Sequence, residues 1–66
     1  MNKKSNLSEM QVILKEFENG LEKLSVEKFN DYILKYPDDN TAKYNLSVIL
    51  EKIGDTKNAI INYENI

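Results

Sequence analysis

The fold of this chain is decided by residues 42–63, which read AKYNLSVILEKIGDTKNAIINY. Apolar residues recur in the first half of this stretch at helical spacing. They are Ala42, Leu46, Ile49, Leu50 and Ile53. Gly54 interrupts the pattern, and Asp55, which follows it, is a good N-cap for a second helix. The stretch therefore predicts two helices joined by a tight Gly-Asp turn.

Three residues punctuate the whole chain, since Gly20, Pro37 and Gly54 are its strongest helix breakers. They divide the sequence into four segments of helical length, so we predict an all-α fold. The second helix is expected from about Glu22 to Tyr36, because the residue before a proline disfavours the helical conformation. No segment alternates polar and apolar residues with a period of two, so no strand is predicted.

The first helix is expected from Ser8 to about Asn19. Its apolar stripe comprises Met10, Ile13, Leu14, Phe17 and Leu21. Ser8 and Gln11 have the spacing of a capping box. We therefore predict that Ser8 caps this helix. Residues 1–7 are expected to form a flexible N-terminus, and residues 8–66 a single helical domain.

The second and fourth predicted helices carry residues of the same class 34 positions apart. The pairs are Ser25 with Ala59, Phe29 with Tyr63, and Tyr32 with Ile66. A fixed period of this length indicates a helical repeat. Phe17 and Phe29 stand one position closer together in the sequence than Leu50 and Tyr63 do. We therefore predict that one residue is missing from the turn near Gly20.

This pattern resembles that of the tetratricopeptide repeat family. Its signature positions are occupied here by Leu46, Ser47, Leu50, Gly54, Asp55, Ala59 and Tyr63. The resemblance implies two helix-turn-helix hairpins in a short right-handed α-solenoid, with a first repeat over about residues 7–39 and a second, truncated one over 40–66. The chain departs from the family at Lys43, where tryptophan is preferred, at Ser47, where glycine is, and at Leu50, where tyrosine is.

Two other interpretations stay open. An unrelated pair of helical hairpins would show the same apolar stripes. Residues 29–37 carry an F-x-x-Y-I-x-x-Y-P pattern that is similar to repeats in bacterial envelope assembly and division coordinators. The sequence shows neither an export signal nor a lipidation cysteine, so we expect a cytoplasmic location.

The composition removes most catalytic and metal chemistry. The 66 residues include no cysteine and no histidine, so the commonest metal ligands and the commonest general base are missing. Asp38 and Asp39 are interpreted as helix caps rather than as a metal or acid–base pair. The nine basic residues are scattered lysines in a chain of net charge −2, which excludes a nucleic-acid footprint. We expect no enzyme activity, no cofactor, no metal and no membrane partner.

What remains is a surface for binding. In the resembled family the first helix of each repeat lines a concave groove that holds a peptide or helix of a partner protein. The groove positions of the second repeat are Thr41, Tyr44, Asn45, Val48, Glu51 and Lys52, and those of the first are Ser8, Gln11, Val12, Lys15 and Glu18. We therefore predict a protein-interaction module or adaptor. The alternative is that Tyr44 and Val48 contact a neighbouring helix.

A structural role is the second predicted function. Solenoids usually need polar caps and about three repeats for stability. The last predicted helix stops at Ile66 with no polar capping helix after it, which leaves an apolar end formed by Ile60, Tyr63 and Ile66. We predict that this end is buried in a homodimer, or that the chain is a fragment or subunit of a larger helical-repeat array.

Overall fold

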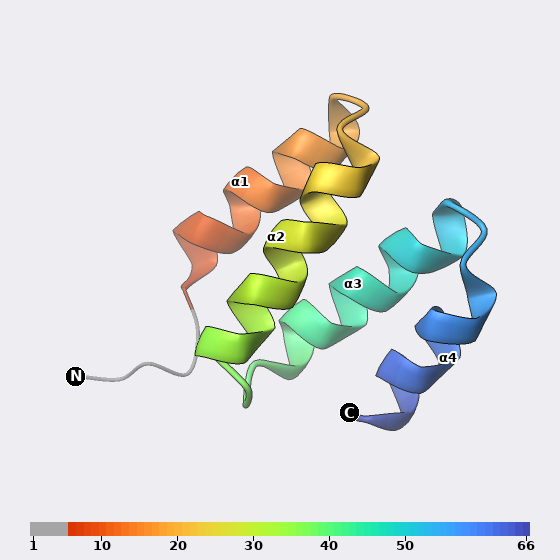
Figure 1. Cartoon of the computed structure of the whole chain (residues 1–66). Coiled ribbons are helices and arrows are strands. Elements are labelled where there is room, and N and C mark those ends of the chain that lie inside the picture. The colour runs from red at the N-terminus through yellow and green to blue at the C-terminus, as the bar shows by residue number, and fades with distance from the viewer. Residues whose placement is uncertain (1–5) are drawn as a thin grey trace.

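The computed structural model describes residues 6–66, which form four α-helices joined by short turns (Figure 1). The helices are α1 (Leu7–Glu18), α2 (Glu22–Lys35), α3 (Asn40–Lys52) and α4 (Thr56–Glu64). These residues contain no strand, so the prediction of an all-helical fold with four helices is confirmed. Every helix in this part of the chain is too short or too polar to span a bilayer. Most of the predicted flexible stretch, residues 1–5, lies outside the described residues.

The start of α1 differs from the prediction. Ser8 is not the cap, because Asn6 holds that position and its Oδ1 accepts a hydrogen bond from the backbone N–H of Glu9 at 3.1 Å. The backbone N–H of Asn6 in turn donates to the hydroxyl of Tyr32 in α2, at 2.7 Å. This contact with a distant residue places the cap at Asn6, and Leu7 becomes the first residue of the helix.

The two hairpins close with the same turn. Gly20 and Gly54 have φ angles of +88° and +90°, a left-handed conformation that only glycine adopts at little cost. In both turns the backbone N–H of the glycine and that of the next residue donate to the last carbonyls of the preceding helix. The bonds run from Gly20 and Leu21 to Phe17 and Glu16 after α1, and from Gly54 and Asp55 to Glu51 and Leu50 after α3. Each group in the second turn lies 34 positions after its counterpart, so the prediction of a missing residue near Gly20 is wrong.

The connection between α2 and α3 is organised by Asp39. Its Oδ1 accepts a hydrogen bond from the backbone N–H of Ala42 at 3.1 Å, which caps α3 as the sequence predicted. Its Oδ2 accepts a second bond, from the hydroxyl of Tyr32, at 2.6 Å. Burial of the phenol is the main reason that the pKa of Tyr32 is raised to about 12. One carboxylate therefore ties the end of α2 to the start of α3.

The core is made of side chains from all four helices. Its buried members are Met10, Ile13, Phe29, Tyr32, Ala42, Leu46, Ile49, Leu50 and Ala59. Ser25 and Ser47 are fully buried beside them, and each hydroxyl donates to a carbonyl of its own helix, at Glu22 and Lys43. Because these serines need no other partner, they act as small residues that let the helices approach closely. In Figure 1 the hairpin α1–α2 lies beside the hairpin α3–α4, with α3 against α2.

Candidate functional site

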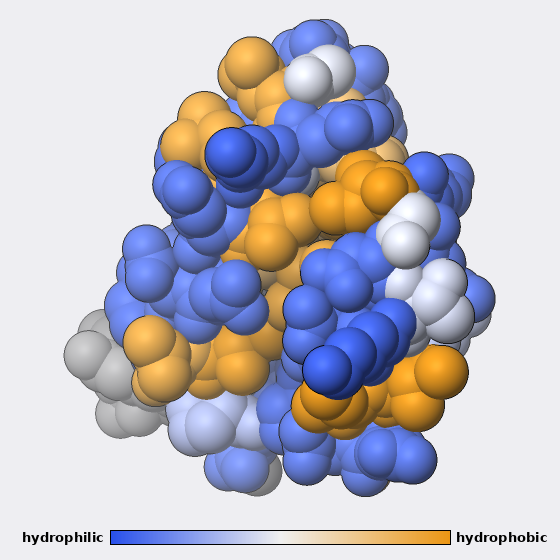
Figure 2. All heavy atoms as spheres, turned by 45° about the vertical axis from the view of Figure 1, so that its right-hand side comes forward, coloured by the Kyte–Doolittle hydropathy of each residue, from blue (hydrophilic) through white to orange (hydrophobic). Residues whose placement is uncertain are grey.

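A hollow of about 190 Å³ lies between α1 and α3, the first helices of the two hairpins. It is lined by Leu14, Phe17 and Glu18 from α1 and by Asn45, Val48, Ile49 and Lys52 from α3. The floor is apolar. Glu18 and Lys52 are the last residues of their helices, so the two charges lie at the same end of the hollow. Figure 2 shows apolar groups at the surface between hydrophilic side chains on one face of the molecule.

Asn45 has a defined orientation in this hollow. Its Nδ2 lies 3.6 Å from the sulfur of Met10 in α1, to which it donates a weak hydrogen bond. The side-chain carbonyl of Asn45 makes no hydrogen bond with residues 6–66. This half-buried carbonyl therefore keeps its capacity to accept a hydrogen bond.

Tyr44 and Glu51 contact the neighbouring helix α4 instead of α1. The ring of Tyr44 packs edge to face on that of Tyr63, with centroids 5.8 Å apart. The hydroxyl of Tyr63 donates to Oε1 of Glu51 at 2.7 Å. This hydrogen bond, with a smaller contribution from desolvation, raises the pKa of Tyr63 to about 12. Tyr44 nevertheless stays exposed over half of its surface.

The six predicted partner-binding residues therefore do not form one uniform surface. Asn45, Val48 and Lys52 line the hollow with α1. Tyr44 and Glu51 lie on the opposite edge of α3 and contact α4. Thr41 is exposed near the start of the helix. Of the predicted groove residues of the first repeat, Glu18 lines this hollow, Val12 lines another one between α1 and α2, and Ser8, Gln11 and Lys15 are exposed.

The sequence reasoning assigned Leu14 and Phe17 to the core and missed them as groove residues. A signal for Leu14 was present, because Leu14 lies 34 positions before Val48, just as Glu18 lies 34 positions before Lys52. Four of the seven residues that line the hollow thus form two equivalent pairs, one member from each hairpin. Phe17 was matched with Leu50 instead of Glu51, which displaced the first predicted helix by one residue relative to the third. Leu14 was therefore not matched with Val48.

The predicted self-association residues, of which Ile60 and Tyr63 lie in α4 and Ile66 just after it, fall into two groups. Ile60 and Ile66 are about half exposed, whereas Tyr63 is half-buried against α3 through the contacts described above. Ile61 is a further exposed apolar residue of this helix. An apolar patch is visible at the lower right of Figure 2, at the height of α4.

The described residues offer little else in the way of chemistry. No group of three acidic or other metal-ligating side chains among residues 6–66 is arranged to hold a metal ion. The ion pairs Lys28–Glu16 and Lys35–Glu9, each at 2.7 Å, connect α2 to α1.

No protein-family model, curated protein or solved structure matches this chain. The hollow between α1 and α3 thus combines an apolar floor with charged residues at one end.

Proposed function

We propose that this chain is a protein-interaction module of the tetratricopeptide type, which binds a peptide or helix of a partner protein along the hollow between α1 and α3. The single observation that carries the proposal is that two pairs of residues lining this hollow hold equivalent positions in the two hairpins, Leu14 with Val48 and Glu18 with Lys52. Repeated hairpins present such a continuous concave surface on one side. The proposal includes a right-handed path of the hairpins and a cytoplasmic location, and it includes no enzyme activity and no cofactor.

The lining residues indicate the ligand chemistry. Val48 and Leu14 suit an apolar side chain of the partner, because burying apolar surface supplies most of the binding free energy in small sites. Asn45 can accept a bond from the backbone N–H of an extended peptide. Glu18 and Lys52 at the end of the hollow favour a peptide that carries both charge signs there.

A peptide-display library selected against the chain tests this proposal. We expect the selected peptides to bind the variant Val48→Glu at least about tenfold more weakly than the wild type, because a carboxylate then lies on the apolar floor. The matched control Leu34→Glu places the same charge on an exposed site of α2, outside the hollow, and should bind as the wild type does. Equal binding to Val48→Glu, or NMR shift changes centred on α4, would contradict the groove.

A second function, as a structural subunit that associates with itself, is favoured by the exposed Ile60 of α4 and Ile66 just after that helix. Singly exposed apolar residues are common, but three exposed isoleucines within residues 60–66 favour a contact. Analytical ultracentrifugation over a range of concentrations tests it. We expect the average mass to rise with concentration, and a monomer at every concentration would refute it.

A further inference from the structure

The 34-residue period of the sequence relates the interface between the two hairpins to two exposed faces, one on α1 and one on α4. Val26 of α2 and Leu46 of α3 line the same hollow, where the two hairpins meet. The residue 34 positions after Val26 is Ile60, and the residue 34 positions before Leu46 is Val12. Ile60 is 51% exposed and Val12 is 56% exposed. Each of the two residues in the internal contact therefore has an equivalent residue 34 positions away in the sequence. These two equivalents, Ile60 and Val12, lie exposed on different helices.

The other residues of the internal hollow extend this relation. They are Asn30, Leu50, Asp55, Asn58 and Asn62. Their counterparts at the same period are Glu64, Glu16, Leu21, Leu24 and Lys28. Leu21 and Leu24 are exposed apolar side chains that contribute little to the core. Two leucines stand where the internal interface has Asp55 and Asn58, and Glu16 stands where it has Leu50, so the repeated face keeps an apolar centre with charged residues around it.

We propose that the chain associates head to tail with a second copy, so that Ile60 on α4 of one copy packs against Val12 on α1 of the next. This proposal rests on the second proposed function, self-association, and specifies its geometry. The template is the contact between the two hairpins of one chain. The same register sets Glu64 of one copy near Lys28 of the next, which is already paired with Glu16, so the apolar residues carry the contact.

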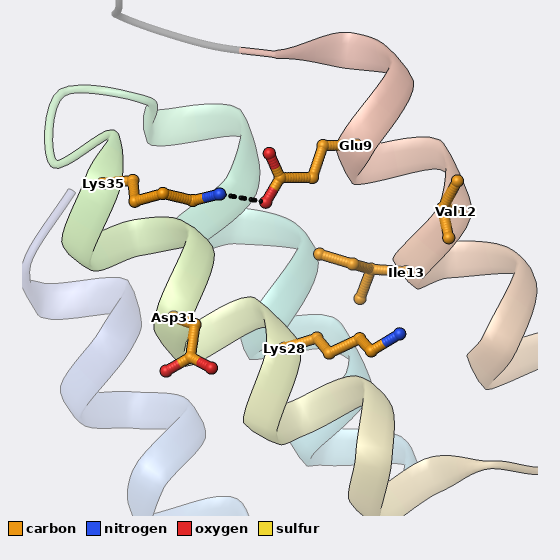
Figure 3. Close-up of a pocket in the computed structure, with 6 residues that line it drawn as sticks. All are labelled: Glu9, Val12, Ile13, Lys28, Asp31 and Lys35. Carbon is orange, nitrogen blue, oxygen red and sulfur yellow. Dashed lines mark ion pairs between the residues drawn. The ribbon is translucent and has the colours of Figure 1, made fainter.

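The receiving face has the shape and charge that such a contact needs. A hollow of about 360 Å³ between α1 and α2 is lined by Glu9, Val12, Ile13, Lys28, Asp31 and Lys35 (Figure 3). In this view Ile13 and Lys28 extend into the space between α1 and α2, Glu9 and Lys35 point toward each other across it, and α3 passes behind α2. Lys35 is paired with Glu9, and Lys28 with Glu16. Because both ammonium groups are already paired, the hollow suits an apolar side chain rather than an anion.

Head-to-tail contact uses two different faces, so it does not close on itself after two copies. The average mass should therefore rise beyond that of a dimer as the concentration increases. A symmetric contact between two α4 helices would instead stop at the dimer. This difference separates the proposed geometry from the predicted homodimer.

Two variants that each remove one face provide the test. Val12→Glu and Ile60→Glu both place a carboxylate at a position that is more than half exposed, so the monomer is expected to fold. Alone, each variant should self-associate at least about tenfold more weakly than the wild type. Mixed together they should form a one-to-one dimer and nothing larger, because each supplies the face that the other lacks. Leu34→Glu, at a position that is 81% exposed and outside both faces, should associate as the wild type does.

Analytical ultracentrifugation of the single and mixed variants gives the readout, and circular dichroism checks that the helices are kept. If either carboxylate lowers the helix content, Val12→Ser and Ile60→Ser repeat the test with a milder change. If Val12→Glu associates as the wild type does and mixing restores nothing, head-to-tail contact is overturned while self-association stands. A wild-type monomer at every concentration overturns both.

Discussion

Replacing Tyr32 by phenylalanine removes one hydroxyl from the point where α1, α2 and α3 meet. That hydroxyl donates to Oδ2 of Asp39 at 2.6 Å and accepts the backbone N–H of Asn6 at 2.7 Å. The ring is fully buried, and phenylalanine keeps its shape. The substitution Tyr32→Phe therefore measures the polar contacts almost separately from packing.

Most of the lost stability is expected to come from Asp39, which is only 7% exposed. Its Oδ1 keeps the bond from Ala42, but its Oδ2 loses its donor in a place that water hardly reaches. A hydrogen bond to a charged group contributes about 1.5–3 kcal/mol to stability. Asn6 is exposed, so its N–H can bind water and adds little. We expect the free energy of unfolding to fall by about 2–3 kcal/mol, from a total of about 3–10 kcal/mol for a domain of this size.

Thermal and urea unfolding followed by circular dichroism at neutral pH give the measurement. Each kcal/mol shifts the Tm of so small a domain by about 4–8 °C, so Tyr32→Phe should lower Tm by about 10–20 °C. Tyr36→Phe is the matched control, because its ring lies 4.6 Å from that of Tyr32 while its hydroxyl makes no hydrogen bond within residues 6–66. The control should change stability by less than about 0.5 kcal/mol.

Two results would refute this reasoning. One is a loss for Tyr32→Phe no larger than that for Tyr36→Phe. The other is additivity in a double-mutant cycle with Asp39→Asn, since a direct bond predicts a coupling of at least about 1 kcal/mol.

The same hydroxyl predicts how stability changes at alkaline pH. Burial raises the pKa of Tyr32 to about 12 in the folded chain, from an ordinary value of 10.0. The fold therefore favours the neutral phenol, and this contribution is complete below pH 10 and is lost as the pH rises through 12. Tyr63 acts in the same direction, because its bond to Glu51 raises its pKa. Wild-type stability should fall between pH 10 and pH 12, and Tyr32→Phe should lose less over that range.

Ala59→Leu should destabilise the chain by about 1–3 kcal/mol, because the methyl group is fully buried between α3 and α4, whereas Lys57→Leu on the exposed side of α4 should change urea unfolding little. Gly54→Ala should lower the free energy of unfolding by about 1–2 kcal/mol in the same assay. The loss comes from the φ of +90° alone, because a Cβ at this position meets no atom within 4 Å. An unchanged urea midpoint would show that the turn relaxes. Glu9→Gln should leave the urea midpoint unchanged, because its partner Lys35 is exposed, and a clear loss of stability would show that this ion pair contributes more than surface pairs usually do.

The turn at Gly54 and the caps of α3 and α4 were predictable because their hydrogen-bond partners are local. Asp39 and Asp55 each accept a bond from a residue three positions later, and Gly54 directly follows the last turn of α3. The start of α1 was not predictable in this way. Asn6 and Ser8 both precede an acid or amide by three residues, so the pattern fits two caps. Tyr32, far along the chain in α2, decides between them.

The sequence predicted that the site residues lie on α3. It did not predict that some of them contact α1 and others contact α4. Asn45 and Tyr44 are neighbours in the sequence, yet one contacts α1 and the other α4. A helical stripe is wide enough to reach both neighbours, and only the positions of those helices determine which edge meets which. The α1 side of the hollow required the correct register between the repeats, which the turn at Gly20 provides.

The sparse burial of α4 has a consequence for motion. Ala59 is its only fully buried residue, whereas α2 buries Ser25, Phe29 and Tyr32. Amide hydrogens of a helix held so lightly exchange with solvent through local opening, at a lower free energy than global unfolding requires. Any molecule that covers the outer side of α4 must also slow this opening. The rate of hydrogen exchange in α4 thus reports whether another molecule covers this helix. Such a molecule would also order the hairpin α3–α4, whose helix α3 lines the hollow with α1.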